Sequence, residues 1–353
     1  MMQHDENTLT HWLTLSQLPV SQRPEESALL TPGYPLAEYV KDRAKTHPIN
    51  QEAITASLRF LDNPQHHIIT LHDPAYPEPL KNIHRPPCLL YIKGQVDTLA
   101  LPQLSIVGSR HPTYQGKTLA HRLAEAMAQL GLCITSGLAL GIDHQAHLGA
   151  LSGGGPTVAV LGHGLNTLYP RAHKKTAERI TETGCLVSTY PPNLGPRKHH
   201  FPERNRLISG LSLGTLIIEA TIKSGSLITG HYALAQNREV MAIPGPLASP
   251  LSAGPHQLIQ QGAALITCPN DILAALSLPT MDADWPETRP AVTTQPLTPR
   301  AETLLKHIPF YPIALSDLIL QQSLDAASLT RELLNLQQHG YIIRTQRGYE
   351  RIT

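Results

Sequence analysis

The sequence has little of what marks secreted, membrane-spanning or strongly basic proteins. Its four cysteines are far apart and form no CxxC pair. Three of them lie in or beside apolar runs, which favours buried free thiols and fits a reducing compartment. The first residues are polar rather than an apolar signal segment, and no apolar run is long enough to span a bilayer. We therefore expect a soluble cytoplasmic protein with no membrane partner.

An excess of charge of one sign is also missing. Charged residues make up 16% of the chain and the formal net charge is +1, so the sequence predicts no overall basic field. Any nucleic-acid binding must then come from a local patch of cations. No Walker loop, HExxH helix or Ser-His-Asp pattern is apparent, which weighs against three common kinds of catalytic site.

The 353 residues, of which 41% are apolar, suffice for two or three domains. Residues 1–65 predict a small helical domain. Apolar residues between Leu9 and Leu18 recur at helical spacing, and Pro19 ends that first helix. Further short helices are expected at Ala28–Leu30, Leu36–Val40 and Ala53–Leu61.

Residues 66–280 alternate between short apolar runs and amphipathic helical patterns such as Gln115–Leu130. This alternation predicts an α/β domain with a doubly wound, mostly parallel sheet. Ligands of such domains bind beyond the carboxyl ends of the strands. The candidate binding segments are therefore the loops that start at Gly108, Gly137, Gly162, Tyr190, Ala220 and Pro244. The expected strands are Cys88–Lys93, Leu104–Gly108, Leu132–Ser136, Thr157–Leu161, Leu186–Thr189, Thr215–Glu219, Glu239–Ile243 and Ala264–Thr267.

Residues 281–299 contain several prolines and few apolar residues, which is typical of a linker. Residues 300–353 predict helices at Arg300–His307, Leu315–Gln321 and Asp325–His339. They are followed by a hairpin whose strands are Tyr341–Arg344 and Tyr349–Ile352. Three helices and a hairpin fit a winged-helix domain.

Three loop segments carry groups suited to phosphate. Gly108 would let a ligand approach the backbone, Ser109 can donate to an anionic oxygen, and Arg110 can bind a phosphate through two nitrogens. The same stretch could also be an ordinary turn with a surface arginine. Residues 223–230 place a lysine, small hydroxyl residues and glycine at a helix start, which suits an anion, although Ser224 or Ser226 could simply cap the helix.

The most basic stretch of the α/β region is Arg197–Arg206. Its cations surround Phe201, whose ring could stack on a base, and that combination suits single-stranded nucleic acid. A solvated charged surface is the plainer interpretation. His199 and His200 have no carboxylate or cysteine at ligand spacing, so a metal site is disfavoured. Gly162–Thr167 matches the dinucleotide pattern GxGxxG only in part, and we expect no nucleotide cofactor.

In their order and spacing these segments resemble the DNA-processing protein A (DprA/Smf) family. The resemblance covers roughly residues 70 to 275. Its main segments are Tyr76–Leu80, Pro86–Gly94, Ile106–Arg110, Ser136–Asp143, Val158–Leu165, Phe201–Arg206, Ser224–Gly230 and Pro244–Gly245.

The resemblance implies an extended Rossmann-like fold that binds single-stranded DNA without catalysis. It further implies protection of incoming DNA and loading of the RecA recombinase during natural transformation, and a homodimer. The implied phosphate-binding residues are Ser109, Arg110, Gly137, Lys198, Arg204, Asn205, Arg206, Lys223, Ser224, Gly225, Ser226 and Thr229, with Phe201 as a base-stacking residue.

This chain departs from the family pattern at three places. Leu140 stands where the family often has arginine, and Ser188–Pro191 lacks the usual carboxylate. The N-terminal domain resembles a SAM-like or degenerate helix-hairpin-helix domain, but Leu18–Ser21 lacks the glycine that would bind a phosphate.

Two alternatives stay open. A Rossmann-like nucleotide-processing enzyme would need a placed acid or base, and Glu219 is its one candidate. The C-terminal domain could instead be the main DNA-binding part. From Leu297 to Thr353, however, six Lys and Arg face five Asp and Glu, which favours protein contact or weak DNA binding over strong duplex recognition.

Overall fold

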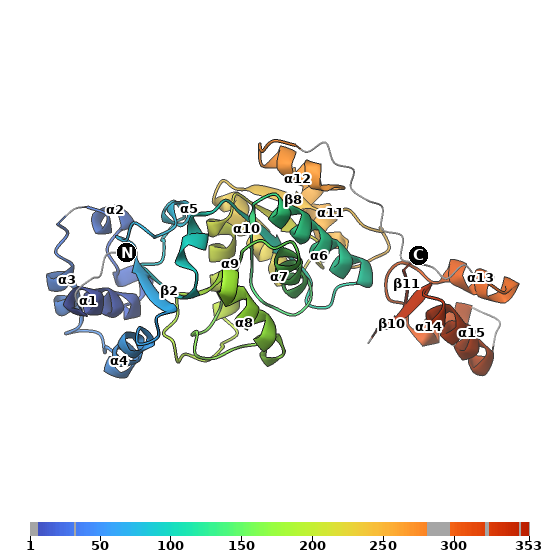
Figure 1. Ribbon diagram of the computed structural model, residues 1–353, viewed down its shortest axis with the longest axis horizontal. Coiled ribbons are helices and arrows are strands. Elements are labelled where there is room, and N and C mark those ends of the chain that lie inside the picture. Colours follow the sequence, from blue (N-terminus) through green and yellow to red (C-terminus); the bar gives the residue numbers. More distant parts are fainter. Residues whose placement is uncertain (1–5, 32, 281–296, 322–324, 346, 353) are drawn as a thin grey trace.

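The structure is a computed structural model that describes residues 6–31, 33–280, 297–321, 325–345 and 347–352. Three groups of elements follow one another along the chain: helices at the N-terminal end, a large α/β part, and a small C-terminal group (Figure 1). Most of the linker expected at 281–299 lies outside the described residues. None of the helices in the described ranges has both the length and the apolar character needed to cross a membrane.

The N-terminal helices pack onto one edge of the sheet. Helix α1 buries Leu9, Trp12, Leu13 and Leu15, and these side chains share one hydrophobic cluster with Leu90 and its neighbours in the sheet. The apolar spacing that predicted an amphipathic first helix therefore marks its buried face. The elements are α1 (Glu6–Gln17), η1 (Val20–Gln22), α2 (Glu26–Leu29), α3 (Leu36–Arg43) and α4 (Gln51–Phe60).

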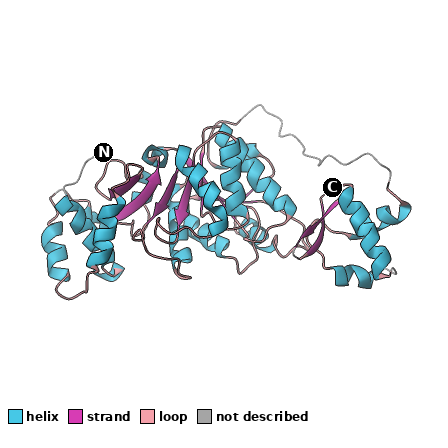
Figure 2. Ribbon diagram, turned by 60° about the horizontal axis from the view of Figure 1, so that its bottom comes forward, coloured by secondary structure: helices cyan, strands magenta, loops and turns pink. Residues whose placement is uncertain are grey.

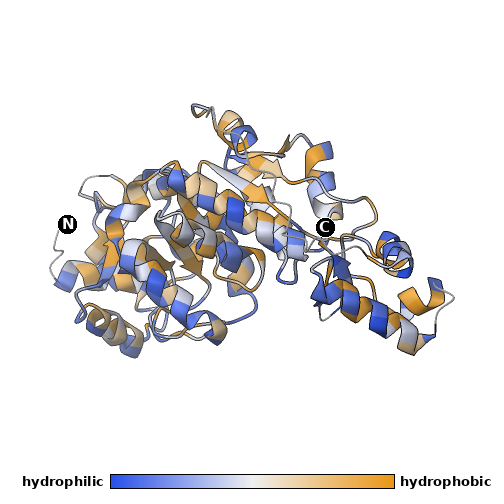
Figure 3. Cartoon of the chain, turned by 45° about the vertical axis from the view of Figure 1, so that its right-hand side comes forward, coloured by the Kyte–Doolittle hydropathy of each residue, from blue (hydrophilic) through white to orange (hydrophobic). Residues whose placement is uncertain are grey.

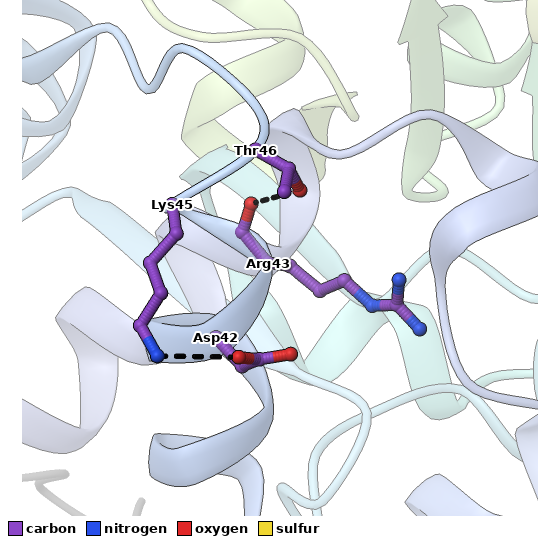
Figure 4. A network of polar contacts seen from close by, with 4 residues as sticks. All are labelled: Asp42, Arg43, Lys45 and Thr46. Atoms are coloured by element: carbon purple, nitrogen blue, oxygen red, sulfur yellow. Dashed lines mark hydrogen bonds and ion pairs between the residues drawn. The ribbon is translucent and has the colours of Figure 1, made fainter.

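Charged and polar residues at the end of α3 contact one another (Figure 4). Lys45 Nζ lies 3.3 Å from Asp42 Oδ1, and the hydroxyl of Thr46 donates to the carbonyl of Arg43 at 3.1 Å. The Arg43 guanidinium lies 5.4 Å from the centre of the Tyr39 ring. Exposed pairs of this kind add little to stability, and here they finish a helix rather than line a cavity.

A nine-stranded sheet forms the centre of the molecule in the order β1-β2-β6-β5-β4-β3-β7-β8-β9. Strands β3 to β9 run parallel, and β1 and β2 are antiparallel to their neighbours. The strands are β1 (His66–Thr70), β2 (Leu89–Gly94), β3 (Gln103–Val107), β4 (Cys133–Ser136), β5 (Thr157–Leu161), β6 (Cys185–Ser188), β7 (Gly214–Ile217), β8 (Glu239–Ala242) and β9 (Ala264–Leu265).

Helices cover both faces of this sheet (Figure 2). Residues of α6, α7 and α12 form one buried cluster with the sheet, and residues of α9 and α10 belong to a second. Figure 3 shows the apolar strands enclosed by helices with mixed surfaces. The elements are α5 (Glu78–Lys81), η2 (Val96–Ala100), α6 (Tyr114–Gln129), α7 (Ile142–Ser152), η3 (Arg171–His173), α8 (Lys174–Thr183), α9 (His200–Leu211), α10 (Gly225–Ala235), α11 (Ala253–Gln260) and α12 (Pro269–Ala275).

The strand order reverses between β3 and β7. From β3 the chain builds β4, β5 and β6 on one side, and it then returns to place β7 on the other side of β3. The loops that leave β3 and β7 therefore diverge to opposite faces, which opens a crevice at the carboxyl ends of these two strands. The prediction of a doubly wound α/β fold is confirmed, and each of the eight expected strands is present within two residues at either end.

The C-terminal group has its own hydrophobic cluster, which includes Leu304, Leu318, Leu333 and Tyr349. Its hairpin strands pair antiparallel, and Ile313 bridges to Tyr349. The elements are α13 (Pro299–His307), α14 (Leu315–Gln321), α15 (Ala326–Gln338), β10 (Ile342–Thr345) and β11 (Gly348–Arg351), close to the expected three helices and hairpin.

Candidate functional site

A cavity of about 650 Å³ lies in the crevice between β3 and β7, and we call it the basic cavity. The loops after β3, β4 and β7 contribute to its wall, as does the start of α9. Its lining residues are Val107, Gly108, Ser109, Arg110, His111, Ala139, Asp143, Tyr169, Lys198, Phe201, Pro202, Arg204, Asn205, Ile208, Thr221, Ser224, Gly225, Ser226, Thr229, Leu251 and Arg347.

The charges around the basic cavity are one-sided. Its lining holds four cationic side chains, those of Arg110, Lys198, Arg204 and Arg347, against the single carboxylate of Asp143. In a chain whose net charge is only +1, this is a local concentration of positive charge. A cleft lined by one sign of charge attracts the opposite charge, so the cavity suits an anionic ligand.

The loop after β3 is fixed to the loop after β7. The Ser109 N–H donates to the carbonyl of Glu219 at 2.6 Å, which ties the ends of the two strands together. The Ser109 hydroxyl oxygen accepts the N–H of His111 at 3.1 Å, so its own proton remains free to donate to a ligand. A Cβ on Gly108 would lie 2.7 Å from Ile142, so this glycine makes room for α7.

The Arg110 guanidinium lies over the ring of Phe201 in the wall of the cavity. The guanidinium carbon lies 5.7 Å from the centre of the phenyl ring, and the ring of Tyr169 lies 5.9 Å from that of Phe201. Among the described residues, no hydrogen bond or ion pair occupies the Arg110 guanidinium or the Lys198 ammonium group. These cations keep their donors for a ligand, next to an aromatic surface on which a planar group can stack.

Arg204 forms the floor of the cavity. It is 4% exposed, and its guanidinium donates to the carbonyls of Gly137, at 2.8 Å, and Val160. Burial lowers the pKa of Arg204 to about 10, so the group stays charged near neutral pH. Burial raises the pKa of Asp143, and the positive charge of Arg204 opposes that rise. Asp143 accepts the Gly137 N–H at 3.2 Å, so it orders the turn above Arg204.

The segment 224–229 closes the opposite side. Ser224 caps α10, its hydroxyl oxygen accepting the Ser226 N–H at 3.3 Å, so the capping role is real. Asn205 donates to the carbonyl of Gly225 at 3.2 Å and joins α9 to this loop. The position of a Cβ on Gly225 is open, and a ligand can therefore approach its backbone closely.

Three of the expected phosphate-binding residues do not line the basic cavity. A Cβ on Gly137 would lie 2.2 Å from the Arg204 guanidinium, so Gly137 provides space for Arg204 rather than for a ligand. Lys223 is exposed just before the cap of α10 and is not one of the lining residues. Arg206 lies about 200° around α9 from Arg204, because successive helical residues are about 100° apart.

Arg206 lines a different cavity, of about 520 Å³, which we call the flanking cavity. There its guanidinium donates to the carbonyl of Arg85 at 2.7 Å. Arg23 in the same wall donates to the carbonyls of Ser16, at 2.8 Å, and Leu18, at 2.9 Å. Tyr190 donates to the carboxylate of Glu203 at 3.0 Å. These charged groups are therefore engaged within the protein.

Two carboxylates meet the N-terminal end of α6. Glu219 accepts the N–H of Thr113 at 2.9 Å and the hydroxyl of Thr113 at 2.6 Å. Glu350, from β11, accepts the N–H of Tyr114 at 2.9 Å. Burial raises the pKa of Glu219, and it raises the pKa of Glu350 to about 7 with help from Glu219. Glu219, the candidate acid or base, thus supports a helix end and does not line the basic cavity.

The glycine turn after β5 is filled by protein. A Cβ on Gly164 would lie 2.1 Å from the carbonyl oxygen of Pro191, and the Gly164 N–H donates to the carbonyl of Leu194 at 2.8 Å. The partial GxGxxG pattern therefore serves the close packing of two loops. Within the described ranges no group of three or more His, Cys, Asp or Glu side chains is arranged to hold a metal ion.

Among the lining residues that the sequence did not assign to the site are His111, Tyr169, Thr221 and Arg347. The first three lie within a few residues of segments that it did identify, and the strand-end rule could have included them. Arg347 comes from the C-terminal hairpin. No local sequence pattern identifies Arg347 as a lining residue, because its position depends on how the hairpin docks on the α/β part.

Comparison with known proteins shows which family the chain is similar to. The model of the DNA recombination-mediator protein A family matches residues 67–277, which is more than half of the chain. Protein Smf of Escherichia coli is 45% identical over 227 residues, or 64% of this chain and 61% of that protein. DNA processing protein DprA of Streptococcus pneumoniae is 44% identical over 202 residues, or 57% of this chain and 71% of that protein.

Solved structures agree with this assignment. DNA processing protein A of Streptococcus pneumoniae superposes with a TM-score of 0.64 at 34% identity, over 77% of this chain and 98% of that one. The protein of the same name from Helicobacter pylori, described for its single-stranded DNA binding mode, gives a TM-score of 0.54 at 30% identity over 60% and 96% of the two chains. This chain therefore belongs to the DNA recombination-mediator protein A family, the DprA/Smf proteins.

Proposed function

We propose that this chain binds single-stranded DNA in the basic cavity, without catalysing a reaction on it. The observation that carries the proposal is the set of four cations beside one carboxylate, with the Phe201 ring 5.7 Å from the Arg110 guanidinium. Phosphates would contact the cations, and an unstacked base would lie on the ring. Such binding depends little on sequence, because every base has a face that stacks.

The single-stranded DNA binding mode described for the Helicobacter pylori relative supports this ligand. Duplex DNA keeps its bases stacked inside, so the aromatic ring would gain nothing from a duplex. We therefore expect a preference for single strands of equal length. The role of Glu219 at the end of α6 supports the non-catalytic part of the proposal, because its carboxylate is already held by Thr113.

Family membership supports a wider proposal about the cellular role. We infer that the chain works in the cytoplasm as a homodimer, protects incoming single strands during natural transformation and loads the RecA recombinase onto them. We also propose three domains, with residues 1–65 helical and SAM-like, 66–280 Rossmann-like and 300–353 a winged helix. The C-terminal helices, hairpin and separate hydrophobic cluster support the last of these.

Fluorescence anisotropy with an oligothymidylate and a duplex of equal length, over a series of salt concentrations, tests the binding proposal. We expect wild type to prefer the single strand. Arg110→Ala should lose about 1.5–3 kcal/mol of binding free energy, roughly tenfold to a hundredfold in affinity. The slope of log K against log salt should fall by about 0.7, since one phosphate contact is lost.

A second variant addresses stacking. Phe201→Leu keeps an apolar side chain and removes the aromatic face, so it should weaken binding by about 1–3 kcal/mol while leaving the salt slope unchanged. Arg179→Ala is the matched control, because Arg179 is an exposed arginine on α8 outside the cavity. Equal affinity of wild type, Arg110→Ala and Arg179→Ala would refute the assigned site. Nucleotide turnover that disappears in Glu219→Gln would refute the non-catalytic proposal.

A further inference from the structure

The C-terminal hairpin reaches the basic cavity. Arg347, in the turn between β10 and β11, is exposed to solvent and is one of the residues that line it. The views agree that this hairpin lies on the side of the C-terminal group nearest the α/β part (Figures 1 and 2). A residue far along the chain from every other lining residue thus completes the wall of the site.

The buried carboxyl group of Glu350 anchors the hairpin in this place. Glu350 is fully buried, and its Oε1 accepts the N–H of Tyr114 at 2.9 Å, in the first turn of α6. Its Oε2 has no hydrogen-bond partner among the described residues. Burying a carboxyl group costs free energy unless it is hydrogen-bonded. The N–H of Tyr114 is a suitable donor, because the first N–H groups of a helix have no partner within the helix. The contact therefore fixes a particular position of the hairpin.

That position is close to Arg110. Tyr114 follows the Ser109–Thr113 segment, whose first residues line the cavity, so the anchor and the Arg110 guanidinium belong to one continuous stretch of chain. Glu350 is three residues from Arg347 in the same hairpin. Anchoring Glu350 on α6 therefore places the turn that carries Arg347 beside the loop that carries Arg110.

The charged residues of the hairpin also favour an anionic ligand. The C-terminal region from Leu297 is balanced, with six Lys and Arg against five Asp and Glu, but three of those six cations lie in residues 341–352. They are Arg344, Arg347 and Arg351, and the only carboxylate of this stretch is Glu350. Arg351 donates to the carbonyl of Leu305 and lies over the Phe310 ring. Because Glu350 is buried, the exposed charges that the hairpin offers to a ligand are those of Arg344 and Arg347.

We propose that Arg347 is a further DNA-phosphate-binding residue and that Glu350 is its positioning residue, so that the bound single strand passes between the α/β part and the C-terminal hairpin. This inference rests on the proposed function and deepens it. The C-terminal group then contributes a wall to the site for single strands instead of acting as a separate duplex-binding part. Arg110 and Lys198 contact the strand from one side, and Arg347 contacts it from the other.

The test uses the full chain and an oligothymidylate at about 0.1 M salt, where one phosphate contact is worth about fivefold in affinity. We expect Arg347→Ala to bind about fivefold more weakly, with the slope of log K against log salt lowered by about 0.7. Arg347→Lys keeps the charge and should keep the slope. Arg344→Ala is the matched control, because Arg344 is an exposed arginine of the same hairpin that does not line the cavity.

A double-mutant cycle tests the positioning role. If Glu350 holds Arg347 over the cavity, then Arg347→Ala should have almost no further effect in a Glu350→Ala background. Thermal unfolding of each variant is the control that checks whether the C-terminal group remains folded. A full fivefold effect of Arg347→Ala in that background would overturn the positioning role.

The outcomes separate the two proposals. If Arg110→Ala weakens binding while Arg347→Ala matches Arg344→Ala and wild type, the site stands and the contribution of the hairpin is refuted. If wild type binds no single strand at all, both the proposed function and this inference fail. Loss of duplex binding alone in Arg347→Ala would assign the hairpin to a different ligand and would also refute the inference.

Discussion

Two cavities of this molecule are rich in arginine, and they differ in what those arginines do. The basic cavity contains Arg110, whose guanidinium has no hydrogen-bond partner among the described residues. In the flanking cavity, Arg23 and Arg206 donate to backbone carbonyls at 2.7–2.9 Å. The hydrogen-bonding capacity of Arg110 is therefore available to a ligand, whereas that of Arg23 and Arg206 is used at least in part by the protein.

A cluster of basic residues in a sequence is therefore not by itself a binding site, because the protein can use their hydrogen-bond donors internally. A guanidinium that already satisfies carbonyls in the protein stabilises a loop, and it would have to give up those bonds to bind a phosphate. Arg204 stands between the two cases. It lines the basic cavity, and only its Nη1 is bonded within the protein, to the carbonyls of Gly137 and Val160, while its Nε has no hydrogen-bond partner among the described residues.

The largest effect is expected for Arg204→Met, which tests this intermediate case. Removing the guanidinium takes away the positive charge that most favours the ionised Asp143, and it removes one donor from each of the carbonyls of Gly137 and Val160. We expect a loss of about 3–5 kcal/mol in the free energy of unfolding, measured by urea denaturation. If the variant unfolds at the same urea concentration as wild type, Arg204 does not stabilise the fold. Its guanidinium would then be available to a ligand, as that of Arg110 is.

A smaller effect is expected for Arg206→Gln, in the flanking cavity. The bond from its guanidinium to the carbonyl of Arg85 is lost, which should cost about 1 kcal/mol of stability. Affinity for single-stranded DNA should stay within about twofold of wild type, because long-range charge effects are screened at 0.1 M salt. A tenfold loss of affinity with unchanged stability would erase the distinction between the two cavities.

The smallest effect concerns pH and the hairpin. The pKa of Glu350 is about 7 when it is docked, raised by burial and by Glu219, against a value of 4.5 when it is free. A raised pKa means that docking favours the protonated carboxyl. The contribution of Glu350 to docking is therefore complete below pH 4.5 and is lost as pH rises through about 7.

The affinity of wild type for single strands should accordingly fall between pH 6 and pH 8 relative to that of Glu350→Gln, by a factor on the order of threefold. Glutamine keeps the shape and cannot ionise, and the other titratable groups near the helix end, Glu219 and Lys117, are the same in both proteins. Parallel pH profiles for the two proteins would show that ionisation of Glu350 does not control the hairpin.

Much of the fold could be predicted because the strands are short apolar runs buried on both faces. The run Thr157–Leu161 is buried at every position and was recognised at its full length. Strand β1 was missed. Its sequence begins with His66 and His67, its first three residues are only half-buried, and it pairs antiparallel at the edge of the sheet, so neither apolar continuity nor alternation marks it.

The sequence could predict which loops form the site, but it could not predict which way the side chains on those loops and on α9 point. The strand-end rule placed Ser109, Arg110 and the Ser224–Thr229 segment together, and they do line one cavity. The rule does not say which way α9 turns its side chains, so Arg204 and Arg206 were treated alike although they point to different cavities. Arg347 could not be predicted, because hairpin docking depends on contacts across the whole chain.

Gly137 and Arg204 have a consequence for how this protein can evolve. The guanidinium of Arg204 occupies the place that a Cβ at position 137 would take. The space is therefore large enough for the Arg204 side chain but not for a second side chain from position 137. A larger residue at 137 is compatible only with a shorter one at 204, and such an exchange would also have to neutralise Asp143. A substitution at Gly137 therefore depends on the residues at 204 and 143, so the effects of changes at these three positions are coupled.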